Sequence, residues 1–221
     1  MNIEWKTSAG LVDYPDALEF MENRVNGIID GKEPEMIWFV EHPPVYTAGT
    51  SSKKDELLDK NKFPVYETGR GGKYTYHGPG QRVAYIMLDL KKRMKEPDLR
   101  KYVNLLEQCV IDTLDELGIK GERRNDRIGI WVVNKDKTEA KIAALGIRVR
   151  KWVSYHGIAI NLNPDLSHFN GIVPCGINQH GVTSINHINK LVSKETLDKA
   201  LKKKLEDVFA ATSSRPYHQK G

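Results

Sequence analysis

The sequence predicts a single α+β domain in which mixed, largely antiparallel sheets are flanked by helices. Segments with helical periodicity alternate with short strand-like runs, and this pattern favours the α+β class. Residues 140–150 and 153–163 are separated by little more than Lys151 and Trp152, which is typical of an antiparallel hairpin. No repeat or low-complexity linker divides the 221 residues. We therefore expect one domain over 1–211 and a polar, loose tail over 212–221.

Helices are predicted over residues 13–31, 98–118 and 193–209. In the first, Asp13 can cap the helix and Pro15 suits its first turn. All three segments place apolar residues on one face with a helical period, so each should pack against a sheet. The second helix carries Cys109 on this apolar face, where the residue is expected to be a small core side chain.

Strands are predicted where apolar and β-branched residues cluster between turn signals. The run 82–90, "RVAYIMLDL", is apolar enough to be buried on both faces. Residues 36–49 begin as a strand and end in a Pro-Pro loop, and 63–81 begin as a strand that enters a glycine-rich loop. The remaining predicted strands are 128–133, 140–150 and 153–163.

Composition limits the possible functions. Lys and Arg exceed Asp and Glu by 34 to 29, and this mild excess favours an acidic partner only weakly. Two cysteines predict a reducing compartment without a disulfide framework. We expect a cytoplasmic protein, because no run approaches the ~18 apolar residues that span a bilayer and no signal-like segment is seen at the start. No metal site is expected, because Cys109 and Cys175 lack C-x-x-C partners and the histidines lack ligand spacing.

The densest motif is the glycine-rich stretch 68–81, "TGRGGKYTYHGPGQ". It matches neither a phosphate-binding Walker loop, because Lys73 is followed by Tyr74, nor a dinucleotide fingerprint, because a strand follows it. The simplest interpretation is a solvated turn. Five glycines with Tyr74, Tyr76 and His77 among them favour instead a loop whose backbone a ligand approaches closely.

Cys175 is the candidate nucleophile, because it lies in a turn between Pro174 and Gly176 rather than inside a regular element. A thiol needs a neighbouring cation or base to react as a thiolate. Lys141 is the most interesting candidate, because it interrupts the apolar strand 140–150. Judged from the residues alone, that lysine is more easily explained as extending to solvent. The other candidates, each more often structural than catalytic, are His77, His156, His168 and His180.

Four ordered segments together resemble the lipoyl(octanoyl) transferase family. They are "GRGGKYTYHGPGQRVAYIMLDL" (69–90), "EAKIAALGIRVR" (139–150), "YHGIAINLN" (155–163) and "FNGIVPCGI" (169–177). The segment "EHPPVYTAG" (41–49) fits the same family. The resemblance implies a biotin/lipoate protein ligase-like fold. It also implies transfer of an octanoyl or lipoyl group from acyl carrier protein to a lysine of lipoyl domains, in 2-oxoacid dehydrogenase complexes and in the glycine cleavage H protein.

The resemblance also assigns roles to residues. Cys175 would carry the acyl group as a thioester, and Lys141 would set the reactivity of its thiol. No ATP is implied, because the donor is already a thioester. No metal is implied, and neither a nucleic acid nor a membrane is an expected partner. The acyl pocket would be lined by Arg70, Gly71, Gly72, Lys73, Tyr74, Thr75, Tyr76, His77, Ala144, Leu145, Gly146, Gly157, Ile158 and Ala159.

Three alternatives remain open from the residues. An ATP-dependent lipoate or biotin ligase of the same fold would need ATP and would not need Cys175. A non-enzymatic RNA-binding module would present a basic stripe with exposed aromatic side chains. A cysteine-dependent hydrolase would release a free fatty acid instead of amidating a lysine.

Overall fold

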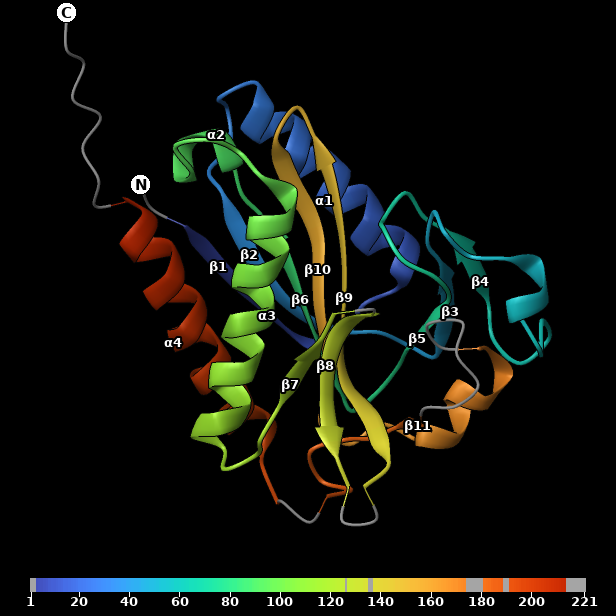
Figure 1. Cartoon of the computed structure of the whole chain (residues 1–221). Coiled ribbons are helices and arrows are strands. Elements are labelled where there is room, and N and C mark those ends of the chain that lie inside the picture. Colours follow the sequence, from blue (N-terminus) through green and yellow to red (C-terminus); the bar gives the residue numbers. More distant parts are fainter. Residues whose placement is uncertain (1–2, 126, 135–136, 174–180, 189–190, 214–221) are drawn as a thin grey trace, which may run out of the picture.

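The computed structural model describes residues 3–125, 127–134, 137–173, 181–188 and 191–213. Two sheets and their helices make up this part of the chain, as Figure 1 shows. The candidate nucleophile Cys175 lies outside the described residues. The candidate His180 also lies outside them.

The larger sheet is the framework of the molecule. Neighbouring strands are antiparallel, except that β1 runs parallel to β2 and β11 runs parallel to β9. The order is β1 (Glu4–Leu11), β2 (Met36–Glu41), β6 (Gln81–Met87), β10 (Val153–Asn161), β9 (Glu139–Arg150), β8 (Arg127–Val133) and β7 (Glu122–Arg124), with β11 (Gly181–Val182) beside β9. The predicted mixed, largely antiparallel sheet is therefore confirmed.

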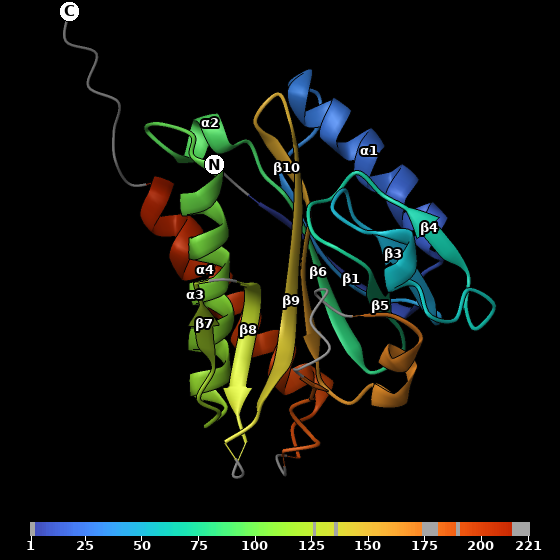
Figure 2. The same ribbon diagram turned by 45° about the vertical axis from the view of Figure 1, so that its right-hand side comes forward.

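The smaller sheet contains β3 (Val45–Ala48) between β4 (Val65–Glu67) and β5 (Thr75–His77). It lies to the side of the larger sheet that carries helix α1 (Tyr14–Ile29), whereas α3 (Leu99–Glu116) and α4 (Lys194–Ser213) cover the opposite face (Figure 2). Three short helical segments complete the described chain: α2 (Leu90–Arg93) and the 3-10 turns η1 (Lys54–Glu56) and η2 (Leu166–Gly171).

Each face of the larger sheet buries its own apolar cluster. Strand β6 belongs to both, since all seven of its residues are buried and alternate residues point to opposite faces. On the α3 and α4 face, Ile86 of β6 packs with Leu106 and Leu201. On the α1 face, Tyr85 packs with Met21 and Val25. The predicted burial of this strand on both faces is confirmed, as is the burial of Cys109 in the first cluster.

Strands β1, β3, β5, β7 and β11 were not predicted from the sequence; the stretches that hold β3 and β5 were expected to be loops, and β11 has only two residues. Strand β1 is an edge strand whose side chains are mostly exposed, and β7 is three charged residues, so neither shows an apolar pattern. The hairpin between β9 and β10 was predicted correctly. Its turn holds Lys151 and Trp152 in left-handed conformations, with φ of 48° and 70°. Positive φ at both residues is characteristic of the type I′ turn, whose twist suits a two-residue hairpin.

Candidate active site

Two segments of the predicted acyl pocket, 144–146 and 157–159, lie side by side in the β9–β10 hairpin. Ala144 pairs with Ala159, and Gly146 pairs with Gly157. Leu145 pairs with Ile158 between them, on the other face of the hairpin. The register therefore places small side chains on one face and aliphatic side chains on the other.

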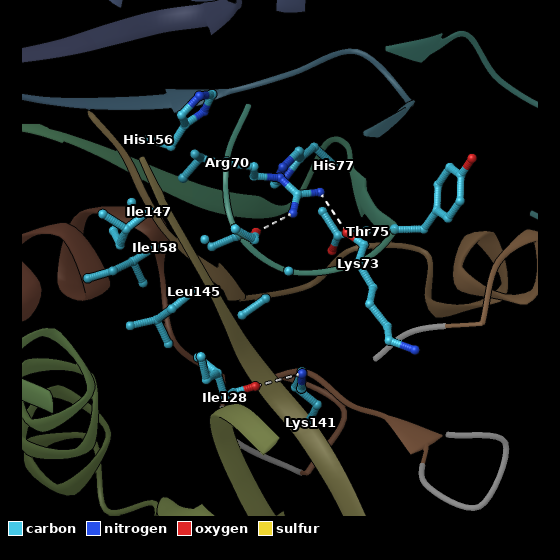
Figure 3. Close-up of a pocket in the computed structure, with 18 of the residues that line it drawn as sticks. Arg70, Lys73, Thr75, His77, Ile128, Lys141, Leu145, Ile147, His156 and Ile158 are labelled. Carbon is cyan, nitrogen blue, oxygen red and sulfur yellow. Dashed lines mark hydrogen bonds between the residues drawn. The ribbon is translucent and has the colours of Figure 1, made fainter. Parts of the chain in front are cut away.

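These strands form part of the wall of a cavity of about 530 Å³, which is within the size range of ligand pockets. Figure 3 shows the side chains around it. Thirteen of the fourteen pocket residues predicted from the sequence line this cavity, and so does Lys141. The lining residues that the prediction missed include Tyr14, Ser51, Gln81, Val83, Tyr85, Leu99, Val103, Arg127, Ile128, Ile147, His156, Asn161 and Phe169.

The two flanks of the cavity differ in character. Figure 3 shows Ile128, Leu145, Ile147 and Ile158 on one side of the hairpin strands and the glycine-rich loop on the other. The aliphatic flank continues to Leu99 and Val103 at the start of α3. The cavity thus offers a narrow apolar chain both aliphatic side chains and closely approached loop backbone.

Tyr76 is the predicted pocket residue that does not line the cavity. Its side chain is fully buried in a separate cluster with Tyr46, Phe169 and Ile172. Its hydroxyl lies 2.8 Å from Nδ1 of His168. Strand alternation explains the difference, because the neighbours of Tyr76 in β5, Thr75 and His77, face the cavity while Tyr76 faces away.

Arg70 braces the glycine-rich loop from within. Its guanidinium is buried and donates to the carbonyl of Thr47 at 2.8 Å, to the hydroxyl of the same residue at 2.7 Å and to the carbonyl of Lys73 at 3.0 Å. It also donates to the carbonyl of Gly71 at 3.0 Å. The loop is tied to β9 by a bond of 3.0 Å from the Gly71 N–H to the Ile147 carbonyl. These contacts fix the loop as a rigid wall of the cavity.

Lys141 points into the site rather than to solvent, contrary to the simplest interpretation of the sequence. The residue is only 6% exposed, and its Nζ donates to the Ile128 carbonyl at 3.0 Å (Figure 3). The ammonium also lies 4.8 Å from the ring centroid of Trp131. Gly129, at φ 126°, makes room for it, because a Cβ there would lie 2.9 Å from Lys141 Cε.

The chain on both sides of residues 174–180 is held by backbone hydrogen bonds. After this segment, Gly181 pairs with Ala140 and Val182 pairs with Lys141, while the Thr183 N–H donates to the Lys141 carbonyl at 2.9 Å. Before it, the Val173 N–H donates to the Glu56 carbonyl at 2.8 Å. The strand that carries Lys141 is therefore bonded directly to the chain that follows the segment with Cys175.

Two neutral histidines face the cavity. Burial is the main reason that the pKa of His77 falls to about 3 and that of His156 also to about 3, with nearby positive groups such as Arg70 adding to both shifts. The Gln81 amide nitrogen donates to Asn161 Oδ1 at 2.9 Å, so its oxygen accepts the 2.6 Å bond from His77 Nδ1. His77 therefore carries its proton on Nδ1.

Beside these histidines lies a buried pair that pattern reasoning did not find. His42 Nδ1 donates to the Val12 carbonyl at 2.6 Å, so its Nε2 accepts the 2.7 Å bond from the Tyr85 hydroxyl. Burial lowers the pKa of His42 to about 4 and raises that of Tyr85. The motif "EHPP" could have indicated His42, but its partner is 43 residues away and is set by the pairing of β2 with β6.

The described residues offer little to the other chemistries considered. In this part of the chain, no three His, Cys, Asp or Glu side chains lie together in a way that could hold a metal ion. No helix of the described residues is both long enough and apolar enough to cross a membrane. Tyr46, Tyr76 and Tyr85 are buried, which counts against the exposed aromatic stripe of an RNA-binding module.

Comparison with known proteins agrees with this geometry. A family model described as the lipoyl protein ligase A/B catalytic domain matches residues 13–206. An octanoyltransferase of Brucella melitensis is 55% identical, with 96% of this chain and 83% of the relative covered. An octanoyltransferase of Bartonella bacilliformis is 54% identical, with 95% and 90% covered.

Solved structures of lower identity share the fold. A bipartite lipoate protein ligase from Thermoplasma acidophilum superimposes with a TM-score of 0.68 at 15% identity, over 95% of this chain and 84% of the ligase. A lipoate-protein ligase A bound with ATP gives 0.65 at 18% identity, over 94% and 86%.

The chain therefore belongs to the lipoyl protein ligase A/B catalytic-domain family, and its biotin/lipoate ligase-like fold is the predicted one. Within that family it is an octanoyltransferase enzyme of protein lipoylation.

Proposed function

We propose that the enzyme transfers an octanoyl, or a lipoyl, group from acyl carrier protein to a specific lysine of lipoyl domains through a thioester on Cys175. The observation that carries the proposal is the position of Lys141, which lines the acyl-sized cavity and pairs in register with Val182. This pairing fixes the chain that leaves the Cys175 segment next to the lysine. The choice of an octanoyl group rests on the relatives, which are octanoyltransferases.

In the first step the Cys175 thiolate attacks the thioester carbonyl of the donor. The carbon–sulfur bond to the phosphopantetheine arm breaks, and the arm leaves as a thiol after taking a proton from Lys141. Lys141 assists by taking the proton of the cysteine thiol or by pairing with the thiolate. The octanoyl chain lies in the cavity, whose lining includes Leu145, Ile158 and the backbone of Gly71 and Gly72.

In the second step the neutral amine of the acceptor lysine attacks the acyl-enzyme. An amide forms, the Cys175 thiolate leaves, and Lys141 accepts the proton that the amine loses. The energy of the donor thioester is kept in the first exchange and drives amide formation in the second. These two reaction steps need no ATP, no metal and no other cofactor. The acceptors are lipoyl domains of 2-oxoacid dehydrogenase complexes and the glycine cleavage H protein.

The test is an incubation of the purified enzyme with octanoyl-acyl carrier protein in the absence of ATP, followed by intact-mass measurement. We expect a gain of one octanoyl group that is lost in Cys175→Ser and kept in Cys109→Ser. Cys109 is the matched control because it is buried in the core. Absence of the adduct, together with modification of a lipoyl domain by ATP and free octanoate, would favour the ATP-dependent ligase.

Adding an apo lipoyl domain to the isolated acyl-enzyme separates transfer from hydrolysis. Transfer predicts that the octanoyl mass moves to the lipoyl domain. Release of free octanoate in place of this product would identify the enzyme as a cysteine-dependent hydrolase and would contradict the proposal.

A further inference from the structure

Glu56 has a place in the structure that neither the motifs nor the cavity lining explain. It ends the 3-10 turn η1 and is only 7% exposed. One carboxylate oxygen accepts the Lys53 N–H at 3.0 Å, and the other forms an ion pair with Lys73 Nζ. Glu56 is not among the described residues that line the cavity, whereas Lys73 is. The carboxylate therefore holds the glycine-rich wall from behind.

The main chain of the same segment holds the approach to Cys175. The Glu56 carbonyl accepts the Val173 N–H at 2.8 Å, two residues before the nucleophile. Leu57 forms a β-bridge with Ile172, and the Leu58 N–H donates to the Gly171 carbonyl at 2.9 Å. Residues 56–58 are thus bonded to 171–173 at three successive positions.

The far end of this connection is also fixed. The Lys73 carbonyl accepts from Arg70 at 3.0 Å and from the Gly49 N–H at 3.3 Å. A shift of Glu56 would therefore be transmitted in both directions, to the wall of the acyl cavity and to the chain that delivers the nucleophile. An ordinary surface ion pair has no such arrangement, because its side chains are free to reorient.

We propose that the Glu56–Lys73 ion pair is a positioning device that aligns the chain before Cys175 with the glycine-rich wall of the acyl cavity. The inference rests on the proposed function, since it takes Cys175 as the nucleophile. Glu56 acts through Val173 and Lys73 and touches no substrate. Its contribution is to hold the thiol and the bound acyl carbonyl in one relative geometry. A displacement of reacting groups by about 1 Å can lower the rate on the order of 100-fold.

The test compares Glu56→Gln, Lys73→Met and the double variant in single-turnover acylation by octanoyl-acyl carrier protein. We expect each single variant to lower the acylation rate constant at saturating donor by roughly 10- to 100-fold, with a smaller change in the donor concentration at half-maximal rate. Because the two residues act as one unit, the double variant should be no slower than the slower single variant. Glu56→Asp should recover part of the rate.

Lys194→Met is the matched control. Lys194 Nζ lies 2.6 Å from Glu41 Oε1, and this pair resembles the Glu56–Lys73 pair in exposure, with side chains 42% and 11% exposed against 30% and 9%. Glu41 also accepts a backbone N–H, from Gly80 at 2.9 Å. Since this pair has no bond to residues 171–173, its loss should leave the acylation rate unchanged. All variants should melt within about 4 °C of the wild type.

Alkylation of Cys175 by iodoacetamide gives a readout without the donor, with the buried Cys109 as the internal reference. Loss of alignment should move the pH midpoint of Cys175 alkylation upward in Glu56→Gln and Lys73→Met but not in Lys194→Met. If wild-type acylation proceeds on Cys175 while both variants keep the full rate, or if their losses multiply in the double variant, the positioning role is wrong although the proposed function stands. If wild-type Cys175 takes no acyl group, the proposed function fails, and an unshifted alkylation profile would refute the positioning role separately.

Discussion

Gly146 and Gly157 face each other across the β9–β10 hairpin, and each is closely covered by another part of the chain. A Cβ on Gly157 would lie 2.0 Å from the Ala84 carbonyl oxygen, which is backbone of the neighbouring strand. A Cβ on Gly146 would lie 2.9 Å from Arg70 Cδ, which belongs to a side chain that lines the cavity. Gly157 thus allows the close approach of strand β6, and Gly146 allows the close approach of Arg70 in the cavity wall.

Substitution should separate these two roles. We expect Gly157→Ala to lower the free energy of unfolding by about 1–3 kcal/mol, because strand β6 must move to admit the methyl group. Gly146→Ala should change stability less and should raise the KM for the octanoyl donor, because Arg70 and the glycine-rich loop shift instead. Denaturant unfolding and steady-state kinetics measure the two effects. Gly10→Ala is the control, since nothing lies within 4 Å of a Cβ there, and equal effects in all three would contradict this assignment.

Ala144 should limit the length of the acyl chain. It lines the cavity on the same face as its cross-strand partner Ala159. Ala144→Leu would occupy part of the volume used by the end of the chain, so the ratio of kcat/KM for octanoyl over hexanoyl donors should fall on the order of 10-fold. The control is Val133→Leu, at a half-exposed position outside the cavity. An unchanged ratio in Ala144→Leu would show that the chain does not reach this wall.

Lys141 should be required for chemistry more than for folding. Lys141→Met keeps the apolar stem beside Trp131 but removes the ammonium that bonds to the Ile128 carbonyl. We expect acylation to slow by roughly 10²- to 10⁴-fold, the range for loss of a general acid or base. Single-turnover mass measurements check this, and thermal unfolding checks the fold. Lys120→Met, at an exposed site, should behave as wild type, and a Lys141→Met enzyme of normal rate would remove the lysine from the mechanism.

The buried histidines predict a loss of stability in acid. His42, His77 and His156 have folded-state pKa values of about 4, 3 and 3, below the ordinary value of 6.5. Between pH 6.5 and these folded-state pKa values, the unfolded chain binds protons that the folded protein does not. The stability that the neutral histidines allow is therefore fully present above pH 6.5 and falls as the pH drops towards 4. Within that window each histidine contributes up to about 1.4 kcal/mol per pH unit.

Thermal unfolding at pH 4.5 to 7.5 measures this dependence. His156→Gln should flatten the slope, because it removes one of the three groups. His187→Gln is the control, at an exposed position outside the cavity. A slope that is the same in all three proteins would show that His156 does not contribute to the acid sensitivity. The same pKa values imply that neither His77 nor His156 titrates between pH 5 and 8 in the rate profile.

Hydrophobic periodicity was sufficient to predict the three long helices, strand β6 and the β9–β10 hairpin, because each buries one continuous face or two. It could not predict β1, whose stability comes from pairing with β2 and not from burial of its own side chains. Nor could it predict that Tyr76 turns away from the cavity while Thr75 and His77 face it. Such facing is decided by which sheet covers the strand.

The sequence by itself determined the family and about half of the residues that line the site, because linked motifs in a fixed order are specific even when each alone is weak. The tertiary structure decided what those residues do to one another. It turned Lys141 inward through the space at Gly129, made Arg70 a brace for the loop, and placed Glu56 between Lys73 and Val173. These contacts join residues from 3 to more than 100 positions apart, so they depend on strand register and burial, which local sequence patterns do not encode.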